Sequence, residues 1–318
     1  MKFTPWDIEK IDSILKLWNK EIGDEFPLRK ELLLQNSFKD ENVCNKGSLI
    51  AENEDGSVVG FILVKRWQES LDVPMSKEAG WIQVLLVDSA YRGQGIGSKL
   101  LEHAESFLKA NSMKKVFLGR DPWHYFPGIP TQYAEVMEWF EHKGYKVSGG
   151  NEVDLLCDYN DKEIDSIPSM EEVTFSLIKE EEKEDLVEFL NRCFPGRWAY
   201  EAIHYFKKGG TGREFAVIKK QEKIIGFCRI NDNQSPFIAQ NVYWAPLFDE
   251  ELGGVGPLGV DPNERKKGYG LAIVEAGIAF LRQRGINKIV IDWTGLVDFY
   301  GKLGYKPWKT YTPYSKSL

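Results

Sequence analysis

Two short glycine-rich, basic segments of this 318-residue chain have the composition of phosphate-binding turns. The first is Arg92-Gly93-Gln94-Gly95-Ile96-Gly97 with Ser98 after it, and the second is Arg265-Lys266-Lys267-Gly268-Tyr269-Gly270. Each follows an apolar run typical of a β-strand (residues 81–87 and 255–260) and precedes an apolar run with helical spacing. A strand, a glycine turn and a helix start in this order direct several backbone N–H groups to one point. The pattern therefore predicts two sites for a phosphate or pyrophosphate.

The two turns belong to a longer internal repeat. In each half an apolar helical pattern runs into a Phe-Pro pair, Phe26-Pro27 or Phe194-Pro195, and strand-like runs with a turn between them follow. After each glycine turn come a helical pattern, a short strand-like run and a Gly-Tyr pair. We therefore expect two similar α/β domains, residues 1–160 and 173–318, joined by an acidic linker at 161–172.

Composition and charge restrict the classes of partner. The formal net charge of −7 argues against a nucleic-acid partner, because phosphate backbones attract basic surfaces. No apolar run approaches the length of a membrane span, and the first residues do not resemble a signal peptide. The cysteines are widely spaced without a CxxC pair, so we expect no metal site, no disulfide framework and a cytoplasmic location. These cysteines are Cys44, Cys157, Cys193 and Cys228.

Two common classes of phosphate site fit the turns poorly. A Walker P-loop requires Gly-Lys followed by Ser or Thr, which neither turn contains. A Rossmann site requires G-x-G-x-x-G at the first turn of a βαβ series, whereas here several strands come first. Asp121 and Asp292 each follow a strand, where a ribose-binding acid would lie in a Rossmann fold, but too little chain remains for further βαβ units.

At this point the sequence resembles the GCN5-related N-acetyltransferase (GNAT) superfamily over nearly all of both halves. Both turns match that superfamily's motif [Gln/Arg]-x-x-Gly-x-[Gly/Ala] without a mismatch. Residues 87–91 (VDSAY) and 260–264 (VDPNE) resemble the usual entry into this motif from the fourth strand. Residues 299–305 (FYGKLGY) resemble its FYxKxGF segment.

The resemblance implies two tandem GNAT-like domains, each a mixed, mostly antiparallel sheet flanked by helices, and acetyl-CoA or coenzyme A as the cofactor. The loop amides would hold the pyrophosphate, and Arg92, Arg265, Lys266 and Lys267 would screen its charge. In this superfamily the fourth strand diverges from the fifth, which would expose backbone groups to the pantetheine amides. The backbone groups concerned are those of Leu85, Leu86 and Val87, and of Leu258, Gly259 and Val260.

The resemblance also implies acetyl transfer to an amine, with a tyrosine protonating the departing thiolate. Tyr300 occupies the place that the superfamily gives to this tyrosine in the second half. Alignment of the two Gly-Tyr regions puts Phe140 opposite Tyr300 in the first half. Phenylalanine cannot donate a proton, so we expect the second half to be catalytic.

The first half carries extra residues between its fifth strand and its last helix, including Trp123, His124 and Tyr125. These side chains could line an acceptor pocket, with His124 as an acid or base and Tyr125 or Tyr133 as a substitute proton donor. The alternative is a loop that simply covers an interface, with its aromatic side chains buried.

Residues of the acceptor site are predicted in the second half. Arg197 and Trp198 follow its first helix, a region that usually shapes the acceptor cleft in this superfamily. Near strand ends, where a base or a cation-binding carboxylate would lie, the sequence has Trp244, Asp249, Glu250, Glu251 and Asp292. We expect a small-molecule amine as acceptor: an amino sugar, aminoglycoside, polyamine or amino acid. The alternatives are a non-catalytic acetyl-CoA-binding half and a peptide or protein N-acetyltransferase. The sequence does not distinguish a monomer from a homodimer.

Overall fold

The computed structural model describes residues 1–163 and 166–318, which form two compact units. The first unit combines three stretches of chain, Met1–Ser70, Ser76–Glu152 and Thr310–Leu318. The second combines Leu71–Met75 with Val153–Lys309.

The first unit is built on a mixed sheet in which β4 and β5 run parallel and the other described strand pairs run antiparallel. Its strand order is β1 (Lys2–Pro5), β2 (Leu49–Glu52), β3 (Val58–Arg66), β4 (Ala79–Val87), β5 (Lys115–Leu118), β15 (Tyr314–Ser317) and β7 (Lys146–Val147). The short strand β6 (Ile129–Pro130) pairs with the end of β14 at Tyr311 and Thr312.

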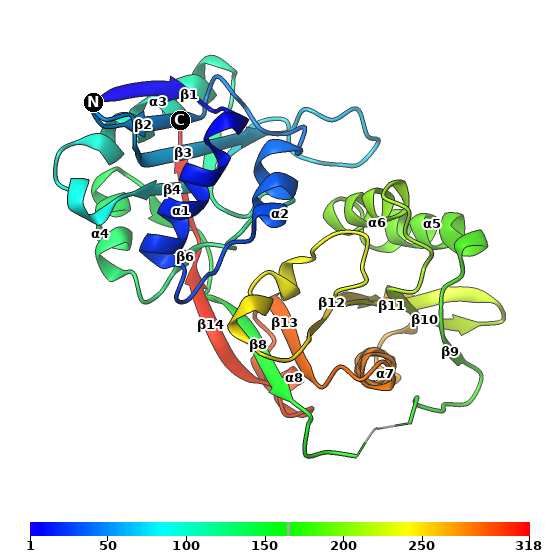
Figure 1. The fold of residues 1–318 in the computed structure, drawn as a ribbon. Coiled ribbons are helices and arrows are strands. Elements are labelled where there is room, and N and C mark those ends of the chain that lie inside the picture. The colour runs from blue at the N-terminus through cyan, green and yellow to red at the C-terminus, as the bar shows by residue number, and fades with distance from the viewer. Residues whose placement is uncertain (164–165) are drawn as a thin grey trace. The chain divides into compact units, whose positions relative to one another are not determined.

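Helices cover both faces of this sheet. Its helices are α1 (Ile11–Ile22), α2 (Lys30–Leu33), α3 (Ile96–Ala110) and α4 (Ala134–His142), with helical turns at Ile8–Lys10, Leu34–Phe38 and Ser89–Tyr91. Figure 1 shows α1 on the near side of the sheet. The apolar face of α3, with Leu100 and Leu108, packs against Ile62 and Val64 of β3 in one buried cluster. On the neighbouring position of β3, Phe61 lies against the ring of Trp6.

The second unit repeats this plan. Its strand order is β14 (Lys306–Thr312), β8 (Glu152–Asp158), β13 (Lys288–Thr294), β12 (Leu252–Val260), β11 (Lys223–Asn231), β10 (Phe215–Lys220) and β9 (Thr174–Leu177). The helices are α5 (Lys183–Cys193), α6 (Arg197–Lys207), α7 (Tyr269–Gln283) and α8 (Val297–Gly301), with helical turns at Glu180–Glu182, Gln240–Val242, Ala245–Leu247 and Pro262–Glu264. Figure 1 shows α5 and α6 on one face of the sheet and α7 on the other. The helix α7 is buried almost all round, as its apolar sequence predicts.

The predicted fold class, two tandem α/β domains with mixed and mostly antiparallel sheets, is confirmed. The chain distributes its last strands differently from the predicted ranges. Residues 153–160 belong to the second unit, where β8 pairs with β13, and residues 310–318 belong to the first, where β15 pairs with β5 and β7. In the predicted linker, residues 164 and 165 lie outside the described residues, and Met170 forms an isolated bridge with Val173. In the part of the chain that the structure describes, every helix is too short or too polar to cross a bilayer.

The exchanged strand β15 should stabilise the first unit although it comes from the far end of the sequence. Tyr314 is buried in the cluster packed by α3, and its hydroxyl donates to Glu141 at 2.6 Å. We expect Tyr314→Ala to lower the free energy of unfolding of the first unit by about 3–5 kcal/mol, the usual cost of truncating a buried aromatic side chain. Urea denaturation measures the loss, and hydrogen exchange at β5 and β7 locates it.

The neighbouring substitution Lys316→Ala is the control, because Lys316 forms a partly exposed ion pair with Glu105 and lies over the edge of the buried cluster, 5.5 Å from the ring centroid of Tyr145. It should change stability far less. Loss of protection in β10 and β11, with β5 and β7 unaffected, would contradict the assignment of β15 to the first unit.

Candidate active site

Both glycine turns end in a left-handed glycine that starts a long helix. Gly95 has φ of +80° and precedes α3, and Gly268 has φ of +85° and precedes α7. Each helix has 15 residues, so its first N–H groups lack partners within the helix and carry the positive end of its dipole. A Cβ added at Gly95, Gly93 or Gly270 would meet no atom within 4 Å. An anion can therefore approach the backbone of both turns.

The start of each turn is held by an aspartate and by a cation from the first α-helix of the same unit. Asp88 accepts from the Ala90 amide at 3.0 Å and pairs with Lys20 of α1 at 2.7 Å. Asp261 accepts from the Asn263 amide at 2.9 Å and pairs with Arg192 of α5 at 2.6 Å. The two turns are thus fixed by the same kind of contact.

The two predicted arginines tie the turns to the strands before them. The Nε atoms of Arg92 and Arg265 donate to the carbonyl groups of Val87 at 3.0 Å and Val260 at 3.2 Å. Arg92 also pairs with Glu21 at 2.7 Å. In the second unit Lys267 pairs with Glu264 at 2.6 Å, beside Gly268. The positive charges therefore lie next to the glycine backbone, where they complement a pyrophosphate.

The strand before each turn separates early from its parallel neighbour. The β4–β5 pairing covers only Ala79–Ile82, and the β12–β13 pairing covers only Leu252–Gly254. Beyond these points, in the pairings that the structure describes, β4 and β12 bond on one edge to β3 and β11. The free edge includes the predicted cofactor positions: Leu85, Val87, Leu258 and Gly259 are half-buried, and Leu86 and Val260 are buried. The free backbone groups of these strands fit the pantetheine part of coenzyme A. The open glycine turn and the helix N-terminus after it fit the pyrophosphate.

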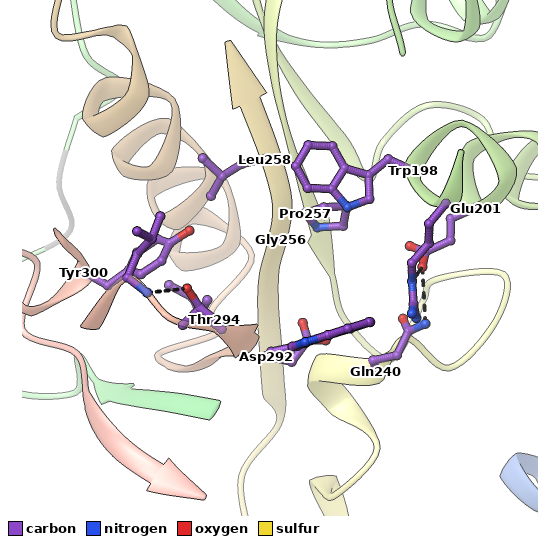
Figure 2. Close-up of a pocket in the computed structure, with 13 residues that line it drawn as sticks. Trp198, Glu201, Gln240, Gly256, Pro257, Leu258, Asp292, Thr294 and Tyr300 are labelled. Atoms are coloured by element: carbon purple, nitrogen blue, oxygen red, sulfur yellow. Dashed lines mark hydrogen bonds and ion pairs between the residues drawn. The ribbon is translucent and has the colours of Figure 1, made fainter. Parts of the chain in front are cut away.

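A pocket of about 330 Å³ opens in the second unit where β12 and β13 diverge. Figure 2 shows Tyr300 on one side of it, Trp198, Glu201 and Gln240 on the other, and Asp292 between them. The residues that line it are Arg197, Trp198, Glu201, Gln240, Gly256, Pro257, Leu258, Ile291, Asp292, Trp293, Thr294, Leu296 and Tyr300. It brings together the predicted residues Arg197, Trp198, Leu258 and Tyr300.

Two β-bulges direct side chains into this pocket. On β13, Ile291 is opposite Leu155 and Thr294 is opposite Val153, so Asp292 and Trp293 together face the single residue Asp154. A second register shift, between Cys228 and Ile230 of β11, lies at the bend of β12. In a regular strand, successive side chains alternate between the two faces of the sheet. A bulge interrupts this alternation, so that neighbouring side chains such as Asp292 and Trp293 can both reach the pocket.

Buried charges surround the pocket floor. Glu201 of α6 accepts from Arg197 at 2.8 Å, from Arg229 at 3.2 Å and from Gln240 at 3.4 Å. The guanidinium of Arg197 also lies over the ring of Trp293, at 4.6 Å from its centroid. Burial, followed by the nearby charges of Asp154 and Glu201, raises the pKa of Asp292 to about 7, against a smaller lowering by Arg197.

Tyr300 is only 5% exposed and packs against Phe299 and Tyr305. In Figure 2 its hydroxyl points toward β12. Burial raises the pKa of Tyr300 well above its usual value, so the phenol keeps its proton at neutral pH. In the first unit the corresponding Phe140 is buried against Trp139 and Tyr145 and offers no hydroxyl.

The extra loop of the first unit is part of its core. Trp123, His124 and Tyr125 are 4%, 2% and 3% exposed. The Tyr125 hydroxyl shares a hydrogen bond of 2.7 Å with Ser37, and its ring lies 4.9 Å from that of Trp18. Burial raises the pKa of Tyr125. These contacts match the alternative in which the loop's aromatic side chains are simply buried.

A buried ion network holds this loop. Lys65 is fully buried, with Nζ 2.7 Å from Asp40 and 2.6 Å from Asp121. Gln83 of β4 donates to Asp121 at 3.2 Å and to the Trp123 carbonyl at 2.7 Å. The space beside β4 at Gln83 is thereby filled by side chains of the unit itself, whereas the edge at Leu85–Val87 is not part of this network.

Other predicted residues lie outside the pocket lining. Trp244 is buried at the start of the turn Ala245–Leu247. Glu250 pairs with Lys288 at 2.6 Å, and Glu251 accepts from the Asn233 amide. No local motif points to Glu201, Gln240, Trp293 or Asp154, which lie on a helix, a turn, the bulged strand β13 and its partner β8. The helix α6, two residues after the Phe-Pro pair, was the available signal for Glu201.

Comparison with known proteins identifies the same two halves. The sequence profile of the acetyltransferase (GNAT) family matches residues 11–126 and 183–305. An uncharacterised N-acetyltransferase of Methanocaldococcus jannaschii is 28% identical over 131 residues, which cover 39% of this chain and 58% of the relative.

Two solved structures resemble the whole chain. The GCN5-related glucosamine N-acetyltransferase region of a fungal multi-domain GH3 β-N-acetylglucosaminidase superposes with a TM-score of 0.87 at 25% identity, covering 99% of this chain and 38% of that one. A tandem GNAT protein from the clavulanic acid biosynthesis pathway superposes with a TM-score of 0.70 at 13% identity, covering 99% and 98%. The predicted tandem GNAT architecture is therefore confirmed. The chain spans little more than half of the archaeal relative and less than half of the fungal protein.

The buried network of the first unit provides a stability test. We expect Lys65→Met to destabilise this unit by about 3–5 kcal/mol, because Asp40 and Asp121 would stay buried without their counter-charge. Lys114→Met is the control, since Lys114 pairs with Glu78 at the surface. Chemical denaturation compares the two variants, and equal losses would contradict the role given to Lys65.

Proposed function

The chain belongs to the acetyltransferase (GNAT) family, and from this premise we propose that its second unit catalyses acetyl-CoA-dependent N-acetylation of a small-molecule amine. The observation that carries the proposal is the pocket at the divergence of β12 and β13. It joins the free edge of β12, a buried tyrosine and a group of carboxylates in one place. Its limited volume favours a small acceptor over a peptide.

The turn before α7 and the free edge of β12 would hold the coenzyme. Backbone amides from Lys267 to Gly270 would bind the pyrophosphate, and Arg265 and Lys266 would screen its charge. The edge at Leu258–Val260 would pair with the pantetheine amides. When bound, acetyl-CoA supplies an acetyl group activated as a thioester.

An amino sugar such as glucosamine is the acceptor that the pocket favours. The ionised carboxylate of Asp292, which lines the pocket, attracts an ammonium group. The indole rings of Trp198 and Trp293 offer apolar faces for a sugar ring, and Gln240 offers hydrogen bonds to hydroxyl groups. The fungal glucosamine N-acetyltransferase region, which superposes on the whole chain, supports this choice.

Tyr300 would protonate the departing thiolate. The amine nitrogen forms the amide bond as the carbon–sulfur bond breaks, and the sulfur takes the phenolic proton. The proton that the nitrogen then loses restores the phenol, so Tyr300 ends the cycle unchanged. Its raised pKa suits a group that must be protonated when the thiolate leaves.

The first unit is a second candidate with a different role. We propose that it binds acetyl-CoA through the Gly95 turn without turnover. It keeps the open glycine cradle and the free edge of β4, but Phe140 replaces the tyrosine and the loop at Trp123–Tyr125 fills its interior.

The first test concerns Tyr300. We expect Tyr300→Phe to lower kcat for glucosamine acetylation by roughly 10²-fold or more, while the Kd for acetyl-CoA stays near normal. Thiol release measures the rate, and calorimetry measures binding. Tyr305→Phe is the matched control, because it removes a hydroxyl from the same buried cluster without lining the pocket. Unchanged turnover in Tyr300→Phe would remove Tyr300 from the mechanism.

The second test separates the two turns. We expect Gly268→Asp to abolish both acetyl-CoA binding in the second unit and turnover, because it places a carboxylate at the anion site. Gly95→Asp should abolish acetyl-CoA binding in the first unit and leave turnover unchanged. Calorimetric stoichiometry counts the sites. Gly285→Asp is the control: Gly285 also has positive φ and open space, but it follows the opposite end of α7. Loss of turnover in Gly95→Asp alone would place the chemistry in the first unit.

A further inference from the structure

We propose that Asp292 is the catalytic base of the second unit, and that Asp154 is the positioning residue that directs it. This inference rests on the proposed amine acetylation, and it names the group that takes the proton from the acceptor's ammonium. Asp154 lies on β8, the strand that the first half of the sequence contributes to the second unit.

The geometry of the β13 bulge connects the two aspartates. Asp154 is 5% exposed, and its Oδ1 accepts from the Trp293 amide at 2.9 Å. Trp293 has φ of +45°, a left-handed conformation that costs free energy for a side-chain-bearing residue. The Asp154 carboxylate therefore stabilises the strained residue next to Asp292. In Figure 2 the Asp292 side chain lies between Tyr300 and Glu201, within the pocket.

Charged and titratable groups from every surrounding element face Asp292. The charged ones are Asp154 of β8, Glu201 and Arg197 of α6 and Arg229 of β11, and the titratable but neutral one is Tyr300 of α8. Burial and the two carboxylates raise the pKa of Asp292 to about 7, and Arg197 lowers it by less. A base whose pKa lies near the working pH is the kind best suited to accept a proton during the reaction.

The proposed step balances in protons and charge. The ionised Asp292 takes one proton from the acceptor's –NH₃⁺, which gives a neutral amine and a neutral carboxylic acid. The amine's lone pair is then available to form the amide bond. Asp292 returns its proton to solvent before the next cycle. Glu201 accepts hydrogen bonds from Arg197 and Arg229, so its charge is compensated and Asp292 is left as the proton acceptor.

Asp154 has two separable effects on Asp292. Its oxygen accepts a hydrogen bond from the Trp293 amide, which holds the bulge that carries Asp292, and its negative charge disfavours ionisation of Asp292. Asp154→Asn keeps an oxygen that can accept from the Trp293 amide but removes the negative charge, whereas Asp154→Ala removes both. The pKa of Asp292 should therefore fall in Asp154→Asn with the bulge retained. A purely structural role would not move this titration in Asp154→Asn.

The deciding experiment is a carboxyl titration by NMR on the free protein, with carbon-13 in the aspartate carboxyl groups. We expect one carboxyl with a midpoint near pH 7, absent in Asp292→Asn and shifted to lower pH in Asp154→Asn. Asp158→Asn is the matched control, because Asp158 lies on the same strand but is exposed and pairs with Lys288. It should leave the midpoint unchanged. An Asp292 that titrates in the ordinary aspartate range, or a midpoint unaffected by Asp154→Asn, overturns the inference.

Kinetics with glucosamine provide the second readout. For the native protein, kcat/KM should fall as pH drops below about 7, because protonated Asp292 cannot accept a proton. Asp292→Asn should lose roughly 10²–10⁴-fold in kcat. Asp154→Asn should shift the acidic limb of the kcat/KM pH profile to lower pH. Asp154→Ala should lower kcat, because the bulge loses the carboxylate that accepts from the Trp293 amide. Asp292→Asn with native kcat overturns the inference. If native protein does not acetylate glucosamine, the proposed acceptor fails alone, since the NMR titration still decides the state of Asp292.

Discussion

The early separation of β12 from β13 is the constraint on which the second unit's site depends. Parallel pairing ends after Gly254, and beyond it one edge of β12 keeps unused backbone groups beside the turn that starts α7. Buried backbone groups need partners, so such an edge persists only where a ligand or water can reach it. The same separation makes room for the pocket. The bulge at Asp292 and Trp293 then presents a carboxylate and an indole there, and α8 places Tyr300 on its far wall.

The exchange of strands joins the halves of the sequence in a way that a simple tandem repeat does not. The second unit receives β8 from the first half, and with it Asp154, while the first unit receives β15 from the C-terminus. The sheet of each unit is therefore complete only when both halves of the sequence are present. A residue opposite the bulge can change the chemistry of the pocket although it precedes the second repeat.

Local motifs explain what the sequence analysis predicted. Gly95 and Gly268 occupy the left-handed positions that require glycine, so the turns, the helices after them and the parallel strands before them follow from short patterns. Tyr300 and Phe140 were found because a Gly-Tyr pair fixes their alignment. The exchange of β8 and β15 was not predicted, because an apolar strand pattern does not specify which sheet it joins. The bulge at Asp292 depends on the register with β8, a contact between residues far apart in the sequence.

The two units treat carboxylates in opposite ways, and this contrast fits the two different roles that we propose for them. In the first unit Lys65 of the chain neutralises Asp40 and Asp121, so the interior is electrically satisfied and closed. In the second unit Asp292 lies near Asp154 and Glu201, and its ionisation is opposed. An acceptor's ammonium would supply there the positive charge that Lys65 supplies in the first unit. The buried lysine and the proposed substrate are thus alternative counter-ions for carboxylates beside a diverging strand pair. The choice between them separates the closed first unit from the second unit, for which we propose catalysis.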